Sequence, residues 1–300
     1  MRTSLISGLL VASVSIFVSA NYAVACGGYG ESEELREDGV VLGDRFVHID
    51  KKGNLVSANM IWGSSRLYGN FELQLLKYIA AEGDRAFVLT KDEVCEVSLK
   101  TGKLLRRQKH EMGICGVGII DADKVFLNNG FKMAIVNLKT GKTLHQIDLK
   151  CNLKAFKKVG KSKLISHSRV GNLVYVARPF TNGVAVVDLS KGNLVREIKT
   201  DNYGWATNVH ATPNNLFVRQ WSSSYGIRTE TLFLVDLKTQ KVKAISLNNA
   251  ARTLHFGLDK SAAPTTMLGT DDGGVVLAVR TTLMRFDAKG TLVNKTPEQG

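Results

Sequence analysis

The best candidates for a catalytic or metal-binding site in this chain, by residue type and position, are two histidines, His210 and His255. They stand at similar places in two successive repeats of the sequence. Two imidazoles facing one channel could bind a divalent metal, or act as a general base and the group that orients it. A catalytic metal usually has a third protein ligand, and Asn208 and Asp259 are the nearest polar residues. The alternative is that both histidines are structural or face solvent.

Motifs of other chemistries are missing from the sequence. It contains no GxSxG nucleophile motif, no phosphate-binding P-loop, no GxGxxG and no calcium-binding EF-hand loop. No Cys pair or Cys/His spacing of the kind that binds zinc occurs either. The sequence therefore supports no nucleophile, nucleotide or zinc chemistry.

Aromatic residues gather in one later stretch of the chain. Tyr203, Trp205, Trp221 and Tyr225 lie close together in sequence, with Ser222–Ser224 among them. Aromatic rings combine a large apolar area with a polar handle, so this stretch could form a binding rim for a sugar or a peptide. The alternative is packing between structural units next to one long loop.

These residues must be positioned by a repeat. A sequence motif, called the phrase below, occurs six times: a run of β-formers, an Asp, Asn or Ser, a turn rich in Lys and Gly, and more β-formers. The copies recur about every 40–50 residues, the period of a four-stranded blade in a β-propeller. They begin at Phe46, Val94, Ala134, Val184, Leu232 and Leu283.

Each phrase is predicted to form a hairpin. Its Asp, Asn or Ser can accept a hydrogen bond from the backbone two residues further on and so start a tight turn. The Gly that usually follows can adopt a positive φ without steric cost. In the fifth copy Gln240 replaces this Gly, which predicts a strained turn or a turn of another type.

Between the phrases, further short runs of β-formers supply the other strands. A run such as Arg85–Thr90 fits the second strand of a blade, and His167 falls in another predicted second strand. The innermost strands, which would line a central channel, are predicted at Tyr78–Ala81, Ile114–Gly118, Lys154–Phe156, Thr207–Ala211 and Thr253–Gly257.

The repeat resembles known propeller families. Leu173–Ala177, Val184–Asp188 and Val209–Val218 resemble the YVTN-type repeat. The Leu-Lys-Thr-Gly-Lys turns that follow Ser98 and Asn137 resemble the PQQ-like repeat of quinoprotein alcohol dehydrogenases and of BamB-type outer-membrane assembly lipoproteins. The resemblance implies a β-propeller from about Val40 to Thr296.

A quinone cofactor is not expected. In quinoprotein dehydrogenases a Trp that docks neighbouring blades follows the Thr-Gly-Lys turn, whereas this chain has Leu104–Gln108 and Thr143–Gln146 there. No haem-binding CxxCH motif accompanies the turns. The expected cofactor is therefore none, with a divalent metal at His210 and His255 as the alternative.

The predicted fold class is all-β: one β-propeller domain over residues 40–300, with about six four-stranded blades. Seven blades stay open if one repeat is degenerate. Little strand-like sequence precedes Phe46, so Val40–Leu42 either adds a strand to the first blade or joins the last blade to close the ring.

The N-terminus reads as a targeting segment. Residues 1–25 combine Arg2, the apolar stretch Leu5–Val18 and the small-residue site Ala23–Ala25, which is typical of a secretory signal peptide. Residues 26–39 form an acidic, flexible leader. No other segment is apolar enough to span a membrane. The predicted location is therefore extracytoplasmic: periplasmic, associated with the cell envelope, or secreted.

Four cysteines leave alternatives open. Cys26 follows the cleavage site, like the lipidated Cys of bacterial lipoproteins, although Ala23 stands where those motifs have Leu. A lipid anchor on Cys26 would leave at least one free thiol among Cys95, Cys115 and Cys151. Without it, two disulfides can form in an oxidising compartment, and Cys115 with Cys151 is the pair predicted.

The chain is strongly basic, with 40 Lys and Arg against 27 Asp and Glu. The densest cluster lies between Lys154 and Lys163 and includes Lys157 and Lys158. These cations either keep the turns solvated or form a surface that attracts an anionic partner. Outside the cytoplasm such a partner would be an acidic glycan, anionic lipid or acidic protein, not nucleic acid.

The sequence thus favours a monomeric, non-catalytic propeller that binds a protein or an anionic envelope polymer. A secreted lyase or hydrolase acting on an acidic sugar, with His210 and His255 in the channel, is the alternative. A quinone-dependent oxidoreductase is the weaker one. The two histidines decide between the first two, because an enzyme needs them to converge on the channel.

Overall fold

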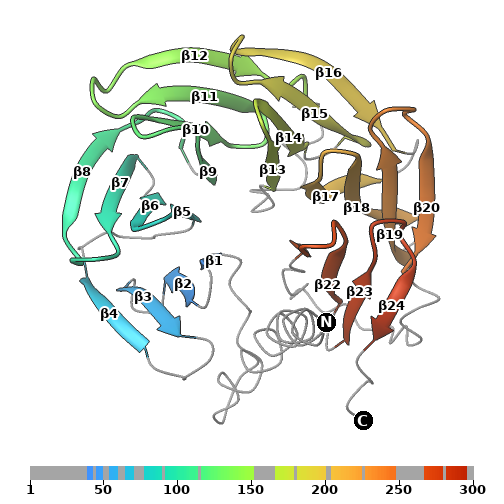
Figure 1. Cartoon of the computed structure of the whole chain (residues 1–300). Coiled ribbons are helices and arrows are strands. Elements are labelled where there is room, and N and C mark those ends of the chain that lie inside the picture. The colour runs from blue at the N-terminus through green and yellow to red at the C-terminus, as the bar shows by residue number, and fades with distance from the viewer. Residues whose placement is uncertain are drawn as a thin grey trace, which may run out of the picture.

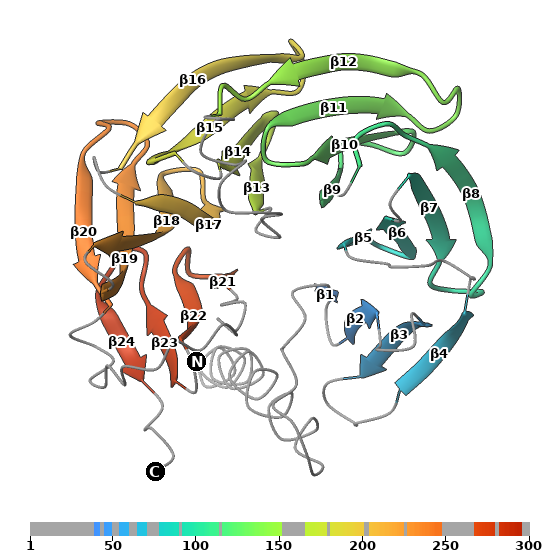
Figure 2. The same cartoon turned by 180° about the vertical axis from the view of Figure 1, so that it is seen from behind.

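The computed structural model describes thirteen stretches of the chain: residues 39–42, 45–49, 54–59, 65–70, 78–89, 92–113, 116–151, 166–178, 181–200, 204–224, 227–247, 267–279 and 282–295. They form six sheets of four strands each, and every sheet uses four strands that are consecutive in the sequence. Figure 1 shows the sheets following one another around a central axis, and Figure 2 shows the same ring from behind. This arrangement confirms an all-β propeller of six four-stranded blades.

The first three sheets have the following strands: β1 (Gly39–Leu42), β2 (Arg45–Ile49), β3 (Asn54–Asn59) and β4 (Ser65–Asn70); β5 (Tyr78–Glu82), β6 (Arg85–Leu89), β7 (Glu93–Ser98) and β8 (Leu104–Lys109); β9 (Gly116–Ile119), β10 (Lys124–Asn128), β11 (Lys132–Asn137) and β12 (Thr143–Asp148).

The last three sheets have these strands: β13 (His167–Val170), β14 (Leu173–Ala177), β15 (Gly183–Asp188) and β16 (Asn193–Lys199); β17 (Trp205–Ala211), β18 (Asn215–Ser224), β19 (Ile227–Asp236) and β20 (Val242–Ser246); β21 (Met267–Gly269), β22 (Val275–Val279), β23 (Thr282–Phe286) and β24 (Leu292–Lys295). Among the described residues, no helix has the length and apolar character needed to cross a membrane.

The core lies between successive sheets. One apolar cluster joins Val184 and Val186 of β15 to Val209 of β17 and Val218 of β18. Other clusters join the second sheet to the third, the third to the fourth and the fifth to the sixth. Because both faces of a sheet are covered, its middle strands are apolar throughout instead of alternating. Each fully buried Val or Leu contributes about 1.5–3 kcal/mol to this packing.

The first sheet answers one question that the sequence left open. Residues 39–42 pair with β2, with Gly39 opposite His48 and Leu42 opposite Arg45. Val40–Leu42 therefore completes the first sheet and does not join the last one. The first phrase forms the β2–β3 hairpin, whereas the other five phrases form the hairpin between the third and fourth strands of their sheets.

The predicted innermost strands are confirmed in three sheets, as β5, β9 and β17. The prediction for the fourth sheet was wrong, because its innermost strand is β13 and Lys154–Phe156 lies outside the described residues. In the sixth sheet the innermost strand is β21, and Thr253–Gly257 also lies outside the described part. His167 consequently belongs to an innermost strand and not to a second strand.

Candidate functional site

Side chains of the innermost strands are directed into the interfaces between sheets. The backbone N–H of Ala211 in β17 donates to the hydroxyl of Ser168 in β13 at 2.9 Å. On the opposite face of β13, Arg169 donates to the carbonyl oxygen of Ile119 in β9 at 2.5 Å. Successive residues of a strand point to opposite faces. The strand β13 therefore holds the fifth sheet on one face and the third sheet on the other.

His167 belongs to this interface. Its ring meets the Phe126 ring edge-on, with centroids 4.8 Å apart and an interplanar angle of 75°. Burial lowers the pKa of His167 to about 4, although a hydrogen bond with the Val117 backbone opposes the shift. Its Nδ1 atom is buried without a hydrogen-bond partner. The imidazole is therefore neutral near pH 7 and serves packing between the third and fourth sheets.

His210, the first of the two predicted site histidines, also lies between sheets. A Cβ atom built on Gly269 would stand only 2.0 Å from Cε1 of His210, so the ring packs directly against Gly269 of β21. Burial lowers the pKa of this imidazole. His255 lies outside the described residues. Within the described part of the chain, no group of three or more His, Cys, Asp or Glu side chains could hold a metal ion.

The aromatic and amide residues predicted for binding lie in the fifth sheet. Trp205 of β17 and Trp221 of β18 are direct cross-strand partners, so the sequence grouping reflects true proximity of the two positions. Asn208 is buried, and its side-chain oxygen has no hydrogen-bond partner. Tyr225 lies outside the described residues.

The long loop expected around the serines is not found there. Ser222–Ser224 continues β18, which pairs with β19 in unbroken register up to Ser224 opposite Ile227. Both strands have ten residues, more than any other strand of the described chain. Midway along this hairpin, buried Arg219 forms an ion pair with Glu230.

Only one of the remaining predicted site residues, Cys151, lies in the described part of the chain. Cys151 is a free thiol that donates to the carbonyl oxygen of Gly130 at 2.9 Å, and burial raises its pKa to about 12. The structure therefore does not show the predicted disulfide with Cys115, which itself lies outside the described residues. Lipidation of Cys26 and binding by Lys154, Lys157 and Lys158 also concern residues outside the described part and stay predictions.

A second region, the outer rim, consists of the turns between third and fourth strands together with the fourth strands of sheets two to six. In the fifth sheet, the carboxylate of Asp236 accepts backbone N–H groups of Lys238 and Thr239 at 2.9 and 2.7 Å. These hydrogen bonds lower the pKa of Asp236. Asn137 and Asp287 accept backbone N–H groups in the same way. The predicted turn chemistry is thus confirmed.

The rim turns dock onto the preceding sheet. The positive-φ glycine Gly141 lies against the Gln108 side chain of β8, and Gly192 lies against the His145 ring of β12. Gln240 adopts a φ of 60°, so the fifth turn keeps the common conformation and carries strain. The outermost hairpins therefore bring the turn of one sheet onto the outer strand of its neighbour.

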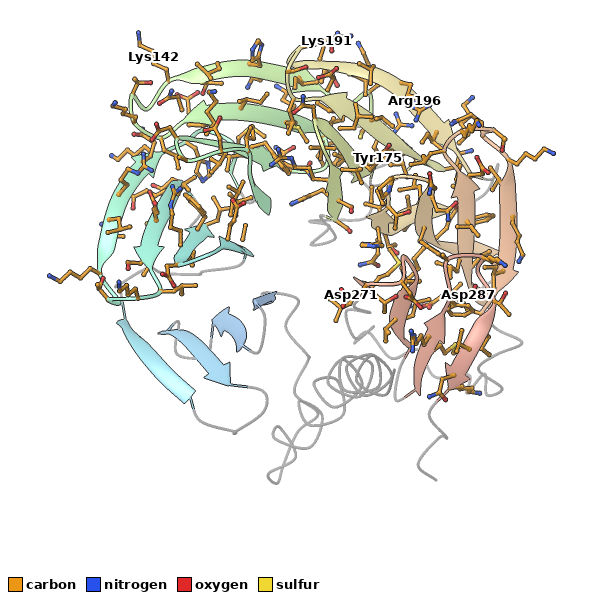
Figure 3. The ribbon with its side chains drawn as sticks, in the orientation of Figure 1. Lys142, Tyr175, Lys191, Arg196, Asp271 and Asp287 are labelled. Atoms are coloured by element: carbon orange, nitrogen blue, oxygen red, sulfur yellow. The ribbon has the colours of Figure 1, made fainter. Side chains whose placement is uncertain are left out.

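Exposed cations are concentrated on the outer rim. The turns between first and second strands of sheets two, three and six instead expose the acids Glu82, Asp84, Asp121, Asp271 and Asp272, although the innermost strand β13 exposes Arg169. Figure 3 shows Lys142, Lys191 and Arg196 at the periphery and Asp271 beside the inner strands. The exposed cations of the outer rim are Lys100, Lys103, Arg107, Lys109, Lys139, Lys142, Lys191, Arg196, Lys199, Lys238, Lys241, Lys243 and Lys289.

Few acids interrupt this basic rim. Asp148 and Glu197 are the exposed acidic residues on its described strands. Glu197 forms an ion pair with buried Arg178 at 3.0 Å. The rim therefore presents an excess of positive charge to solvent.

Comparison with known proteins gives information on the fold alone. No family model matches the chain, and no curated protein matches it. The structure of Kuenenia stuttgartiensis hydrazine synthase is similar, with a TM-score of 0.66, 12% identity and coverage of 90% of both chains. The computationally designed Ika8 protein is also similar, with a TM-score of 0.55, 15% identity and coverage of 86% of this chain and 73% of that one. At such identities the likeness shows the fold alone.

Sequence reasoning singled out the cluster Lys154–Lys163 and did not predict the outer rim as a basic surface. The signal was present: Lys recurs at fixed positions of the repeated turn, as at Lys100 and Lys139, or Lys103 and Lys142. Acidic residues recur in the turns that precede second strands, as at Asp84 and Asp123. Reading charge by its position in the repeat would have predicted the basic rim.

Proposed function

We propose that this chain is a non-catalytic, extracytoplasmic propeller that acts as a binding scaffold for a protein or for an anionic glycan or lipid surface of the envelope. The observation that carries the proposal is the concentration of exposed cations on the outer rim, with exposed acids in the inner turns of sheets two, three and six. On this proposal, the partner binds the rim and not the central channel.

Electrostatics supports the rim as the binding region. Several lysines on neighbouring turns produce a summed potential that attracts an anionic surface over a Debye length of about 8–10 Å. The acids of the inner turns repel the same partner from the channel mouth. A polyanion that reaches the propeller is thereby directed to the periphery.

The sequence resemblance agrees with this proposal. YVTN-type and PQQ-like repeats, the latter found in BamB-type lipoproteins, are the families that the phrases resemble, and scaffolds occur among them. The predicted signal peptide in residues 1–25 would place the chain where envelope polymers are found. The alternative enzyme hypothesis depends on His210, whose ring lies against Gly269 between two sheets.

The test is binding of a soluble polyanion, dextran sulfate, by the full chain over a range of salt concentrations. The rim variant Lys103→Gln/Lys142→Gln/Lys191→Gln is expected to weaken binding about tenfold or more, because each lysine near an anionic surface contributes about 1 kcal/mol. The charge-matched control Lys124→Gln/Lys132→Gln/Lys150→Gln removes three cations away from the rim and should change binding less than about twofold.

Two results would contradict the proposal. Equal weakening in both variants would mean that only the net charge matters and that no rim surface exists. Absence of binding by the unmodified chain, even at low salt, would refute an anionic partner altogether.

A further inference from the structure

The fourth strands of sheets two, three, four and six each contain one residue that has no partner on the third strand. In the second sheet, Glu96 is opposite Arg106 and Val97 is opposite Leu104, which leaves Leu105 unpaired. This is a β-bulge, in which one extra residue on a strand has no partner. The residues left unpaired at the corresponding places of sheets two, three, four and six are Leu105, Leu144, Val195 and Val293.

All four bulged residues are apolar and exposed. The exposed fractions are 51% for Leu105, 43% for Leu144, 42% for Val195 and 55% for Val293. Single exposed apolar residues are ordinary on protein surfaces. Here, however, the same exposed position of the repeat is apolar in four sheets. Geometry alone does not require an apolar side chain at an exposed bulge.

Each bulged residue lies close to an exposed lysine of its own turn. Lys103 precedes Leu105 by two residues, Lys142 precedes Leu144 by two, and Lys191 precedes Val195 by four. The outer rim therefore repeats a pair that consists of one cation and one apolar side chain. Such pairs combine attraction to anions with surface that is removed from water on contact.

Three of these residues lie on three successive sheets, and we call them the apolar arc: Leu105, Leu144 and Val195. Gly141 packs on the side chain of Gln108. Gly141 precedes Leu144 by three residues and Gln108 follows Leu105 by three, so Leu105 and Leu144 lie within roughly 20 Å along the rim. Gly192 packs on His145, the neighbour of Leu144, so Val195 lies at a similar or shorter separation.

The fifth sheet ends the arc. Its outer strand pairs without a register shift, from Thr231 opposite Ser246 to Val235 opposite Val242. The third residue after Gln240 is Lys243, where the other turns have an apolar residue. Val293 in the sixth sheet is therefore separated from the arc and provides a matched control.

We propose that the apolar arc, with Lys103, Lys142 and Lys191, docks this propeller onto the surface of an anionic lipid bilayer. The proposal rests on the proposed function, since it names the anionic partner of the same rim. Lysines would bind the headgroups at about 1 kcal/mol each, and the Leu and Val side chains would enter the boundary between headgroups and acyl chains.

Other occupants fit the arc less well. A hydrophilic polyanion has no apolar surface to cover Leu105, Leu144 and Val195. A second copy of this chain carries the same basic rim and is repelled by it. An extended peptide adding to the outer strands would meet a bulge in each, and bulges at sheet edges disfavour strand pairing.

The test compares two probes on variants of the full chain that share one N-terminus. The probes are vesicles of phosphatidylglycerol mixed with phosphatidylethanolamine, and soluble dextran sulfate; phosphatidylcholine vesicles are the neutral control. Leu105→Ser/Leu144→Ser/Val195→Ser should weaken binding to anionic vesicles about tenfold and change dextran sulfate binding less than about twofold. Val293→Ser should leave both unchanged.

The outcomes separate the inference from the proposed function. If the arc variant binds anionic vesicles as well as the unmodified chain does, lipid docking is overturned while polyanion binding stands. If Val293→Ser weakens vesicle binding as much as the arc variant, the localisation to the arc is wrong. If the unmodified chain binds dextran sulfate but no vesicles, the partner is a polymer or protein; if it binds neither probe, the proposed function fails too.

Discussion

The inner strands and the outer rim are made by the same antiparallel pairing, yet they use polar side chains in opposite ways. Near the axis, Ser168 and Arg169 bond to the backbone of neighbouring sheets, and His167 is buried in neutral form. On the rim, residues such as Lys142 and Lys191 extend into solvent. Polar groups near the axis therefore stabilise the ring, whereas those at the periphery are available to a partner.

The difference follows from the geometry of the ring. Inner strands pack against neighbouring sheets, as β13 does against β9 and β17. Close packing removes water, so each polar group there needs a protein partner. The fourth strands have one face toward the outside of the ring, where water reaches the side chains and unpaired charges cost little. Recognition can therefore evolve on the rim without disturbing the core.

The largest expected effect concerns Glu96, which ties a rim strand to an inner turn. Its carboxylate is 2% exposed and binds Arg85 and Arg106, and Arg106 also bonds Asp123 of the next sheet at 2.9 Å. Glu96→Ala removes both ion pairs and leaves Arg85 without a carboxylate partner, whereas Arg106 keeps Asp123, and it should lower the free energy of unfolding by about 3 kcal/mol. Urea denaturation measures it.

A matched variant sharpens this prediction. Glu93→Ala breaks the more exposed contact with Arg107, 3.3 Å long, and should cost less than about 1 kcal/mol. Dextran sulfate binding should survive in both variants. A Glu96→Ala protein as stable as the unmodified chain would show that the buried network does not hold the sheets together.

The next effect is a loss of stability in mild acid through His167. Its pKa is about 4 in the folded chain and near 6.5 when unfolded, so the unfolded state binds the proton more readily. The stabilisation is complete above about pH 6.5 and is lost as the pH falls toward 4, by roughly 3 kcal/mol at most. Urea midpoints measured across this pH range report the loss.

Substitution identifies the group responsible. His167→Gln should lower stability at pH 7 and flatten the pH dependence between about 6.5 and 4. His145→Gln, which changes an exposed histidine of β12, is the matched control substitution. An unchanged profile in His167→Gln would assign the pH dependence to other residues.

The smallest effect is at the rim turns. Gln240→Gly removes a side chain from a residue with φ of 60° and should stabilise the chain by about 0.5–1 kcal/mol. Gly192→Ala should act in the opposite direction by about 1–2 kcal/mol, because φ is 64° there and the new Cβ would stand 2.3 Å from the His145 ring. Thermal unfolding of both variants measures the two changes in stability. If Gln240→Gly is less stable than the unmodified chain, the hydrogen bond that the Gln240 side chain donates to the carbonyl oxygen of Leu237 outweighs the strain.

Local signals were predicted well because they depend on neighbours in the sequence. The turns at Asn137 and Asp236 form as the residue types require, and β6 and β14 lie where β-formers follow turn residues. A strand at His167 was expected, but its place as the innermost strand β13 was missed, because Ser168 and Arg169 bond to β17 and β9, which are distant in the sequence. A contact between sheets leaves no local pattern.

The sequence by itself determined the all-β class and the hairpin turns and favoured six blades over seven, since these depend on residue type and spacing within one repeat, and the six sheets of the structure settled the number. Only the tertiary structure decided that His210 faces Gly269, that Val40–Leu42 belongs to the first sheet, and that cations gather on the rim. The reason is physical: orientation and charge distribution depend on how sheets pack around the axis, which brings together residues distant in the chain.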